Sequence, residues 1–399
     1  MTARTSTTSR REFLAVTAGA AAAAALGPIA TATPTADTFR AAVIGHTGRG
    51  DYGHGLDVVF KDVPGVEVVA LADAGADDAA RAKLAAKAGA ARHYADYRQM
   101  LSKERPQLVS IAPRWTDQHH AMAMAALAAG AHLLTEKPFM RTPAEADEVI
   151  AAADHAGRKI AVAHQMRMAP SVVHLNRAIG EGLVGDLLRI DAWGKQDARA
   201  GGEDTLVLGT HLFDLMRLFA GDARWCTARV LQQGRDITPA DAHATGEDIG
   251  PVVGDEVFAQ FGFDRGVNAT FTSRSRLREQ VGHWGIELTG SKGSARVLAD
   301  IEPRVFVMKP TGWTDAGRTD TWAPLKTPDV STDGPKGTDA ANRRIVDDWL
   351  EAIRTNREPA CSGRNGAAAV EMVMAICRAG LSQTRVAIPL KERGHPLVK

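Results

Sequence analysis

Lys137 is the first residue whose type and surroundings suggest acid–base chemistry. It stands between Glu136 and Pro138 and follows the apolar pair Leu133–Leu134, which is typical of a short buried strand. Proline pushes the residue before it towards an extended conformation, so this lysine is held stiffly at the end of a strand. Open α/β sheets bind their ligands at the carboxyl ends of strands. A surface Glu-Lys pair before a turn proline is the alternative interpretation, and the rest of the chain has to decide between the two.

His211 is the second such residue, and a helix is expected to position it. The segment Gly209–Gly221 has apolar residues at helical spacing and ends in glycine, which predicts an amphipathic helix. With Thr210 as N-cap, His211 falls in the first turn, where the helix dipole disfavours imidazolium and leaves the ring ready to accept a proton. We expect Asp214, on the same face, to fix the tautomer of the ring. A capping-region histidine without chemistry is the alternative.

A glycine-rich turn predicts a nucleotide site early in the chain. The β-prone run Phe39–Ile44 leads directly into Gly45-His-Thr-Gly-Arg-Gly50. A dinucleotide site needs a strand, a tight glycine turn and a helix N-terminus that faces the pyrophosphate. Thr47 stands where the middle glycine of G-x-G-x-x-G is expected, so we expect Gly48 to supply the close backbone approach. A helix is expected after Gly50, with an opening that two further glycines make irregular.

An acidic residue after the second strand favours NAD as the dinucleotide. The apolar run Val66–Ala72 ends in Asp73, 28 residues after Gly45 (positions 45 to 73), against a usual spacing of about 20. A carboxylate at this position accepts the adenosine ribose hydroxyls and repels a 2′-phosphate, so NAD is favoured and NADP is not excluded. The alternative is that Asp73 caps a helix that begins near Asp77.

Strand-like and helix-like segments alternate up to Ala163. This alternation predicts a Rossmann domain over residues 38–163, with a doubly wound parallel sheet. The expected helices span residues 77–89, 98–103, 118–130 and 142–157, and the further strands span 108–112, 133–134 and 159–163. The segment His164–Arg167 then follows a strand and faces the same crevice as Lys137. We assign His164 itself no catalytic role, because a structural histidine explains it equally well.

After Pro170 the chain changes to short β-prone runs with loops between them. This pattern predicts an α+β domain over residues 164–399, with a large open mixed or antiparallel sheet. Its expected strands span residues 187–193, 227–232, 257–263, 267–273, 285–288, 295–298 and 386–390. The two C-terminal helices, 340–354 and 366–383, are expected to cover one face of this sheet. The crevice between the two domains is the natural ligand site.

The segment 1–37 has the parts of a twin-arginine export signal. Arg10-Arg11 precedes the alanine-rich run Ala15–Leu26, and Ala30-Thr31-Ala32 offers a small-residue cleavage site. The apolar run is too short and too weakly hydrophobic to span a core of ~30 Å. We therefore expect export of the folded protein to the periplasm, with its cofactor inside, and no stable membrane span in the mature chain.

Composition argues against other classes of partner. Lys plus Arg number 48 and Asp plus Glu 47, a formal net charge of +1, which gives no reason to expect a nucleic acid partner. The three cysteines, Cys226, Cys361 and Cys377, are too few for a disulfide framework and are not spaced as zinc ligands. We expect buried free thiols, with a single disulfide bridge in the periplasm as the alternative, and no metal site.

Taken together, these motifs resemble the glucose–fructose oxidoreductase/inositol dehydrogenase family, Gfo/Idh/MocA. The resemblance rests on the glycine turn, Asp73, the stretch from His120 to Pro138 that ends in Glu-Lys-Pro, and the Gly-Thr-His-x-x-Asp segment at 209–214. It covers nearly all of the chain after residue 37. It implies a nicotinamide dinucleotide in the first domain and a sugar, polyol or glycoside held by the second. It also implies a homo-oligomer that pairs through the second-domain sheet.

The resemblance also assigns roles to single residues. Lys137 and His211 would flank the oxidised hydroxyl, and Glu136 would lie beside the nicotinamide ribose. A lysine near a cationic nicotinamide should have a lowered pKa and can act as the base for the hydroxyl proton. The predicted cofactor contacts are Gly45, Thr47, Gly48, Gly50, Asp73, Pro113, His120, Glu136, Lys137 and Gln165. The predicted substrate contacts are Lys137, Arg167, Lys195, His211 and Asp214.

One position departs from the family pattern. Dehydrogenases of this family often have an acid four residues before the histidine, where this chain has Val207. Glu203 and Asp204 lie further upstream, so either one of them serves instead or the relay consists of Lys137 and His211 alone.

Three functions are therefore open at this stage. The first is a sugar oxidoreductase with tightly held NAD(H), which oxidises one sugar and reduces another. The second is a redox-neutral enzyme that cleaves a glycoside by transient oxidation, elimination and re-reduction. The third is a non-catalytic sugar-binding protein. Trp193 and Trp284 are candidates for stacking on a sugar face, with core packing as the alternative.

Overall fold

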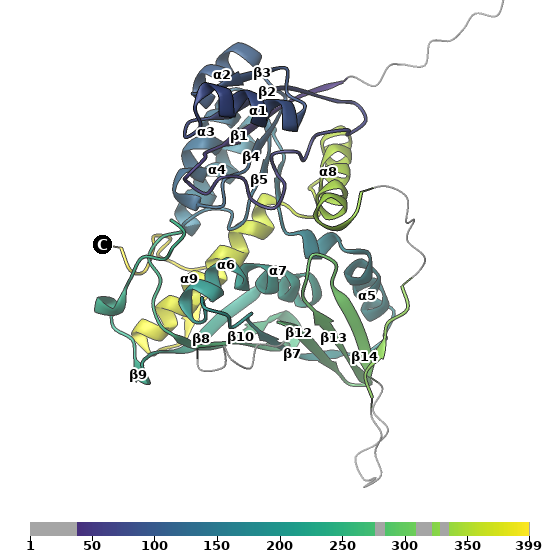
Figure 1. Cartoon of the computed structure of the whole chain (residues 1–399). Helices are drawn as coiled ribbons and strands as arrows, with labels where there is room; N and C mark the ends of the chain where they lie inside the picture. Colours follow the sequence, from purple (N-terminus) through teal and green to yellow (C-terminus); the bar gives the residue numbers. More distant parts are fainter. Residues whose placement is uncertain (1–37, 276–283, 309–320, 328–334, 399) are drawn as a thin grey trace, which may run out of the picture. The chain divides into compact units, whose positions relative to one another are not determined.

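The structure, a computed structural model, describes residues 38–275, 284–308, 321–327 and 335–398 of the chain. The segment interpreted as an export signal lies outside these ranges. Within them, no helix is both long enough and apolar enough to cross a membrane. Two sheets organise the described residues (Figure 1).

The first sheet has six parallel strands in the order β3-β2-β1-β4-β5-β6, as predicted for a Rossmann domain. The strands are β1 (Phe39–Gly45), β2 (Val66–Asp73), β3 (Arg92–Tyr94), β4 (Leu108–Ile111), β5 (His132–Thr135) and β6 (Ile160–Val162). The helices between them are α1 (Asp78–Ala88), α2 (Tyr97–Glu104), α3 (His119–Ala128) and α4 (Pro143–Ala156). Alternate residues of β1, such as Ala42 and Val43, belong to two different core clusters, because both faces of the sheet are covered.

The helix expected after Gly50 is not formed, and this prediction was wrong. Residues 51–63 run as a series of turns instead. Asp51 and His54 have φ angles of +48° and +43°, which a right-handed helix does not accommodate. The segment still buries the ring of Phe60, so its apolar side chains help to cover the sheet as a helix would.

The helix α8 (Gly337–Thr355) packs on this turn segment and on the first sheet. Its Trp349 is fully buried, and the rings of Trp349 and Phe60 are stacked with centroids 6.2 Å apart. Ile345 shares a core cluster with Val43 of β1. The expectation that this helix covers the second sheet was therefore wrong. Its apolar face packs instead on the turn segment that stands in place of a helix.

The second sheet contains ten strands among the described residues and is mixed, as predicted. Its order is β15-β14-β13-β12-β7-β11-β10-β8-β16, with β9 paired to β8, and β7 and β11 are parallel. The strands are β7 (Leu187–Trp193), β8 (Ala223–Gln232), β9 (Arg235–Asp236), β10 (Glu256–Phe263), β11 (Asn268–Arg274), β12 (Gly285–Gly290), β13 (Gly293–Leu298), β14 (Arg304–Met308), β15 (Ala323–Pro324) and β16 (Val386–Ala387).

Helices cover one face of the second sheet (Figure 1). They are α6 (Gly202–Val207), α7 (Gly209–Ala220) and α9 (Gly363–Ser382), while α5 (Pro170–Gly180) follows the first sheet and packs near β14. The short helix α6 was not expected from the sequence. It leads directly into α7, which carries His211.

Candidate active site

Lys137 lies directly after β5, at the carboxyl edge of the first sheet, as its sequence context predicts. Its side chain is only 5% exposed, and its peptide bond to Pro138 is cis. The Nζ atom donates a hydrogen bond to the carbonyl oxygen of Val207, 3.2 Å away, at the end of α6. Burial lowers the pKa of Lys137 although the carboxylates of Glu136 and Glu247 act in the opposite direction. The amine is therefore nearer to its basic, neutral form than an exposed lysine would be.

Glu136 is a fully buried carboxylate that is paired inside the site. Its Oε2 accepts the backbone N–H of Lys137, and its Oε1 pairs with Nδ1 of His54. Burial alone would raise the pKa of Glu136, but His54 and Lys137 outweigh burial and lower it. The sequence analysis missed His54, although its place between Gly53 and Gly55, just after the glycine turn, was an available signal.

His211 is buried in the first turn of α7. Its Nδ1 atom has no hydrogen-bond partner among the described residues. Burial lowers the pKa of His211 well below its usual value, and the charge of Lys137 adds to this effect. The rings of His164 and Trp284 meet it edge-on, with centroids 5.4 Å and 6.1 Å away. A neutral imidazole with an unpaired nitrogen is suited to accept or return a proton.

The start of α7 differs from the prediction. Leu208, rather than Thr210, is the N-cap of α7. Leu208 is the single residue between the end of α6 at Val207 and the start of α7 at Gly209. The hydroxyl of Thr210 is buried inside the helix and has no partner in the part of the chain that the structure describes. His211 nevertheless stays within the first turn, where the helix dipole favours the neutral ring.

Asp214 does not hydrogen-bond to His211, contrary to expectation. Its carboxylate binds the guanidinium of Arg167 through two contacts, Nε to Oδ2 at 2.8 Å and Nη2 to Oδ1 at 2.9 Å. Burial would raise the pKa of Asp214, but Arg167 and the nearby His164 outweigh it and lower the pKa. A guanidinium charge binds a carboxylate more strongly than a neutral imidazole does. Arg167 and Asp214 thus bind each other. The predicted contacts of these two residues with a substrate stay predictions.

The glycine turn lies at the carboxyl end of β1, where the strand order reverses. Gly48 has φ of +78°, and a Cβ atom there would meet nothing within 4 Å, so its surface is open to a ligand. The backbone N–H of Thr47 donates to Asp73 at 2.9 Å. The N–H of Gly48 donates to Oδ1 of Asp51 at 2.7 Å. Carboxylates therefore occupy two amides, those of Thr47 and Gly48, that such turns offer to a phosphate.

Gly45 and Gly50 limit the turn on its two sides. Gly45 is the last residue of β1, and a Cβ there would overlap the ring of Tyr52. Gly50 has φ of +84° and packs against the backbone of Trp115. Both predicted glycines thus allow close packing within the protein, and Gly48 is the one whose surface is open.

Asp73 ends β2 and is fully buried. Besides Thr47, it accepts the hydroxyl of Tyr52 at 2.7 Å and the backbone N–H of Gly75 at 2.9 Å. Burial would raise the pKa of Asp73, but these donors outweigh it and lower the pKa. Asp77, and not Asp73, is the N-cap of α1. Asp73 joins two loops here, and its contact with a ribose stays a prediction.

Two further predicted cofactor residues lie at strand ends, whereas His120 does not. The carbonyl of Pro113, after β4, pairs with the ring of His119 at 2.7 Å. Gln165 follows β6 and donates to Asn342 of α8 at 3.0 Å. The ring of His120 pairs with Glu148 of α4 at 2.8 Å. The structure thus places this ring against a neighbouring helix rather than at the strand edge.

Asp204, one of the two acids considered in place of Val207, holds a loop. It accepts the hydroxyl of Ser273 at 2.6 Å and the backbone N–H of Lys195 at 3.3 Å. Burial raises the pKa of Asp204 despite these bonds. The side chain of Lys195 is half-exposed, with Nζ 3.6 Å from Asp197. Asp204 thus positions the loop after β7. The predicted contact of Lys195 with a substrate stays a prediction.

Glu247, which the sequence analysis did not single out, acts on the site through its charge. It raises the pKa of Lys137 against the stronger effect of burial. The next residue, Asp248, lies 3.6 Å from Arg49 of the glycine turn. Glu203 is half-buried, and burial raises its pKa, with the charge of Glu247 adding to this. A carboxylic acid with a raised pKa can serve as a proton donor.

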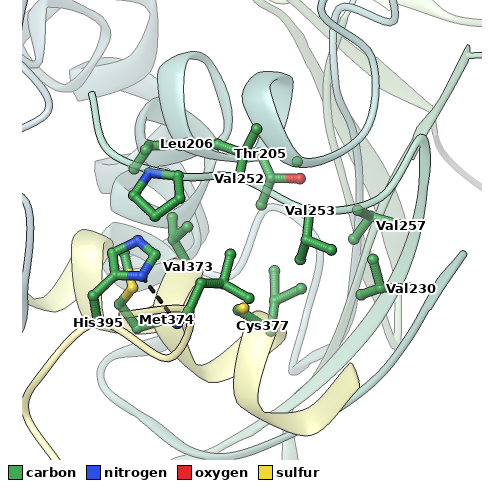
Figure 2. A pocket seen from close by; sticks show the side chains of 14 residues that line it. Thr205, Leu206, Val230, Val252, Val253, Val257, Val373, Met374, Cys377 and His395 are labelled. Atoms are coloured by element: carbon green, nitrogen blue, oxygen red, sulfur yellow. Dashed lines mark hydrogen bonds between the residues drawn. The ribbon is translucent and has the colours of Figure 1, made fainter. Parts of the chain in front are cut away.

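A separate pocket is lined by residues of α6, β8, β10 and α9 (Figure 2). It is lined mainly by apolar side chains such as Leu206 of α6, Val230 of β8 and Met374 of α9. Neither Lys137 nor His211 lines it. The chemistry of the candidate site therefore does not extend into this pocket.

Two family models match this chain. Residues 39–164 match the oxidoreductase family with an NAD-binding Rossmann fold, and residues 173–388 match the C-terminal alpha/beta domain of the same family. These matches cover well over half of the chain, so the protein belongs to the Gfo/Idh/MocA oxidoreductase family. The first domain is its NAD-binding domain, and the prediction of NAD is confirmed at this level.

Individual relatives agree with this assignment. The chain is 28% identical over 358 residues to D-apiose dehydrogenase of Paraburkholderia graminis, covering 87% of this chain and 89% of that relative. A solved NAD-binding oxidoreductase from Klebsiella pneumoniae has a TM-score of 0.70 at 22% identity, covering 89% of this chain and 100% of that one. Levoglucosan dehydrogenase, solved with NADH and levoglucosan, has a TM-score of 0.70 at 19% identity, with 88% and 99% covered. These two structures support the fold.

Removing the negative charge of Asp214 should destabilise the protein. The Asp214→Asn variant leaves the buried guanidinium of Arg167 without its counter-ion, and we expect a loss of about 3 kcal/mol in the free energy of unfolding. Asp222→Asn is the matched control, because Asp222 pairs with Arg217 at an exposed position, and its loss should stay below about 1 kcal/mol. Urea unfolding of both variants measures the difference. Equal losses would contradict a special role for the buried pair.

Removing the charge of Asp51 should strengthen NAD binding. Asp51→Asn keeps an oxygen that can accept the N–H of Gly48 and removes a negative charge from the turn. We expect the Kd for NAD to fall about threefold at low salt, and the gain to shrink as salt rises. Calorimetric titration at two salt concentrations measures it. Asp300→Asn, which also alters an exposed carboxylate that accepts a backbone N–H, is the control. A higher Kd would show that the carboxylate supports the binding shape of the turn.

Proposed function

We propose that the protein is an NAD(P)-dependent oxidoreductase that acts on a secondary hydroxyl of a sugar, polyol or glycoside. The observation that supports this most strongly is the buried amine of Lys137, whose pKa is lowered by burial. Its position after β5 is that of a general base beside the dinucleotide site. The relative named D-apiose dehydrogenase and the structure with bound levoglucosan support a carbohydrate as the substrate class.

The residues at this site divide the work of alcohol oxidation. The nicotinamide, when bound, supplies the hydride acceptor. Lys137 in its neutral form takes the hydroxyl proton, and the neutral ring of His211 is available to hold or return a proton on the substrate side. Glu136 keeps a negative charge in the site. The open surface of Gly48 at the strand switch point fits a dinucleotide, while Asp73 would have to exchange its present donors for a ribose.

We further propose that the cofactor is tightly held and that the protein is exported folded by the twin-arginine route. The paired arginines and the alanine-rich run before residue 38 support export. The periplasm offers no pool of free dinucleotide, which favours a closed cycle in which one sugar is oxidised and another is reduced. We also propose that two copies pair through the second sheet.

A redox-neutral glycoside-cleaving reaction is the second candidate. Two observations favour it: Val207 stands where family dehydrogenases often have an acid, and burial raises the pKa of the nearby Glu203. Transient oxidation acidifies the neighbouring C–H, and a protonated carboxylic acid can then assist departure of the glycosidic oxygen. Release of free sugar from a glycoside without net NADH formation would distinguish this reaction from simple oxidation.

Replacing Lys137 should abolish turnover without abolishing cofactor binding. Lys137→Met retains length and apolar bulk but removes the base, and we expect kcat to fall about a thousandfold. The assay follows oxidation of a panel of sugars and glycosides and hydrogen transfer between pairs of them. Lys87→Met, which alters an exposed lysine paired with Asp57, should leave kcat unchanged. Unchanged turnover in Lys137→Met would show that this lysine is not the base, whereas a wild type that turns over no member of the panel would favour a non-catalytic sugar-binding protein.

The rate of oxidation should rise with pH, and the midpoint of this rise should lie below the pKa of an ordinary lysine. The neutral amine is the base, so activity increases as pH rises through the pKa of Lys137. Because burial lowers this pKa, the rise should fall below the usual lysine pKa of about 10.4. Measurement of kcat against pH tests this. A rise only in the ordinary lysine range would contradict it.

A further inference from the structure

We propose that His54 is a positioning residue that binds the carboxylate of Glu136 and thereby leaves the amine of Lys137 available as the base. The inference rests on the proposed function in one respect, the role of Lys137 as a base. It concerns a histidine that lies on the turn segment 51–63, outside the motifs from which the site was predicted.

The side chains of Glu136 and Lys137 bind other partners instead of each other. Two neighbouring side chains of opposite charge are buried together, and a direct ion pair would be the simplest arrangement. Instead, Glu136 uses one oxygen for His54 and the other for the backbone N–H of Lys137. The Nζ atom of Lys137 turns to the carbonyl of Val207. Within the described residues, the two side chains form no ion pair with each other.

The turn segment and α8 hold His54 in this position. The carbonyl oxygen of His54 accepts a hydrogen bond from Nδ2 of Asn342 at 2.6 Å. Asn342 is 3% exposed, and its Oδ1 accepts from Gln165 at 3.0 Å. A Cβ atom on Gly53 would lie 2.2 Å from Oε1 of Glu136. The backbone before His54 is thus pressed against the carboxylate, and only glycine permits that approach.

The side chains of His54 and Glu136 differ in their exposure to water. The side chain of His54 is 34% exposed, whereas that of Glu136 is 0% exposed. A histidine side chain with this much contact with water would otherwise have many orientations, so the bond to Glu136 orders the ring. Asn342 holds the backbone of His54. Water therefore reaches the pair from the side of His54.

The charges around Lys137 determine how its pKa should change when His54 is replaced. Glu136 and Glu247 stabilise its ammonium form, while Arg199 and Arg114 oppose it. Nδ1 of His54 occupies Oε1 of Glu136, so this oxygen does not pair with Nζ of Lys137. Without His54, the carboxylate would act on Lys137 more strongly, so the pKa of Lys137 would rise and less of the neutral base would be present at a given pH.

Competitive acetylation tests the inference without any substrate. The full-length protein is treated with trace acetic anhydride across a pH series, and labelling of Lys137 is quantified by peptide mass spectrometry. In His54→Leu we expect the labelling midpoint of Lys137 to move to higher pH. His54→Gln, which keeps a hydrogen-bond donor, should return most of the way to the native midpoint. His93→Leu is the control, because His93 on β3 is also a partly exposed histidine that pairs with a carboxylate, that of Asp78.

Unchanged labelling of Lys137 in His54→Leu would overturn the inference. His54→Gln guards against a folding defect, because it keeps a donor for Glu136 and its labelling midpoint should lie near that of the native protein. In steady-state assays on any sugar that the wild type oxidises, we expect kcat of His54→Leu to fall about tenfold, with KM changed less than about twofold. If the wild type oxidises no sugar, the proposed function fails, whereas the labelling series still decides the role of His54.

Discussion

The buried carboxylate of Glu136 and the buried amine of Lys137 are adjacent in sequence, and the site depends on keeping them apart. Neither group is stable in the interior without partners. Glu136 obtains them from His54 and from the backbone of Lys137. Lys137 obtains one from the carbonyl end of α6. The turn segment 51–63, α6 and α8 can all be understood as the elements that satisfy these two charges.

The same requirement connects the first domain with the second. Lys137 follows β5 but bonds to Val207, and Arg167 follows β6 but binds Asp214 of α7. These buried polar contacts place the neutral ring of His211 close to the lysine. In the first domain, Asp73 plays a comparable part, because it collects donors from the loops that follow β1 and β2. Buried carboxylates thus fix the loops at the strand ends, where family members bind NAD.

The sequence was sufficient wherever a local pattern decided the structure. Apolar runs and the alternation of strands and helices predicted the parallel sheet, and the Glu-Lys-Pro motif placed Lys137 at a strand end. Local pattern was insufficient for residues 51–63, because apolar residues suited to a helix are interrupted by left-handed residues such as His54. Very short elements, such as β3 and α6, were also missed, since tertiary hydrogen bonds define them more than propensity does.

Partners that lie far apart in sequence could not be predicted. Asp214 was expected to bind the histidine three residues before it, but Arg167, 47 residues away, binds it instead. The role of Asn342 is similar, since 288 residues separate it from His54. Periodicity predicted that α8 is amphipathic, but it contained no information on which sheet its apolar face covers. Only the fold as a whole decides such competition among partners.

The most direct test of the central claim is whether the purified protein carries a dinucleotide and which one. The purified full-length protein would be denatured, and the extract would be analysed by mass spectrometry and by the absorbance of reduced nicotinamide. We expect stoichiometric NAD(H), because the site around Glu136 and Lys137 is built beside an NAD-binding domain. Protein that contains no dinucleotide and binds no added NAD would contradict an oxidoreductase centred on Lys137.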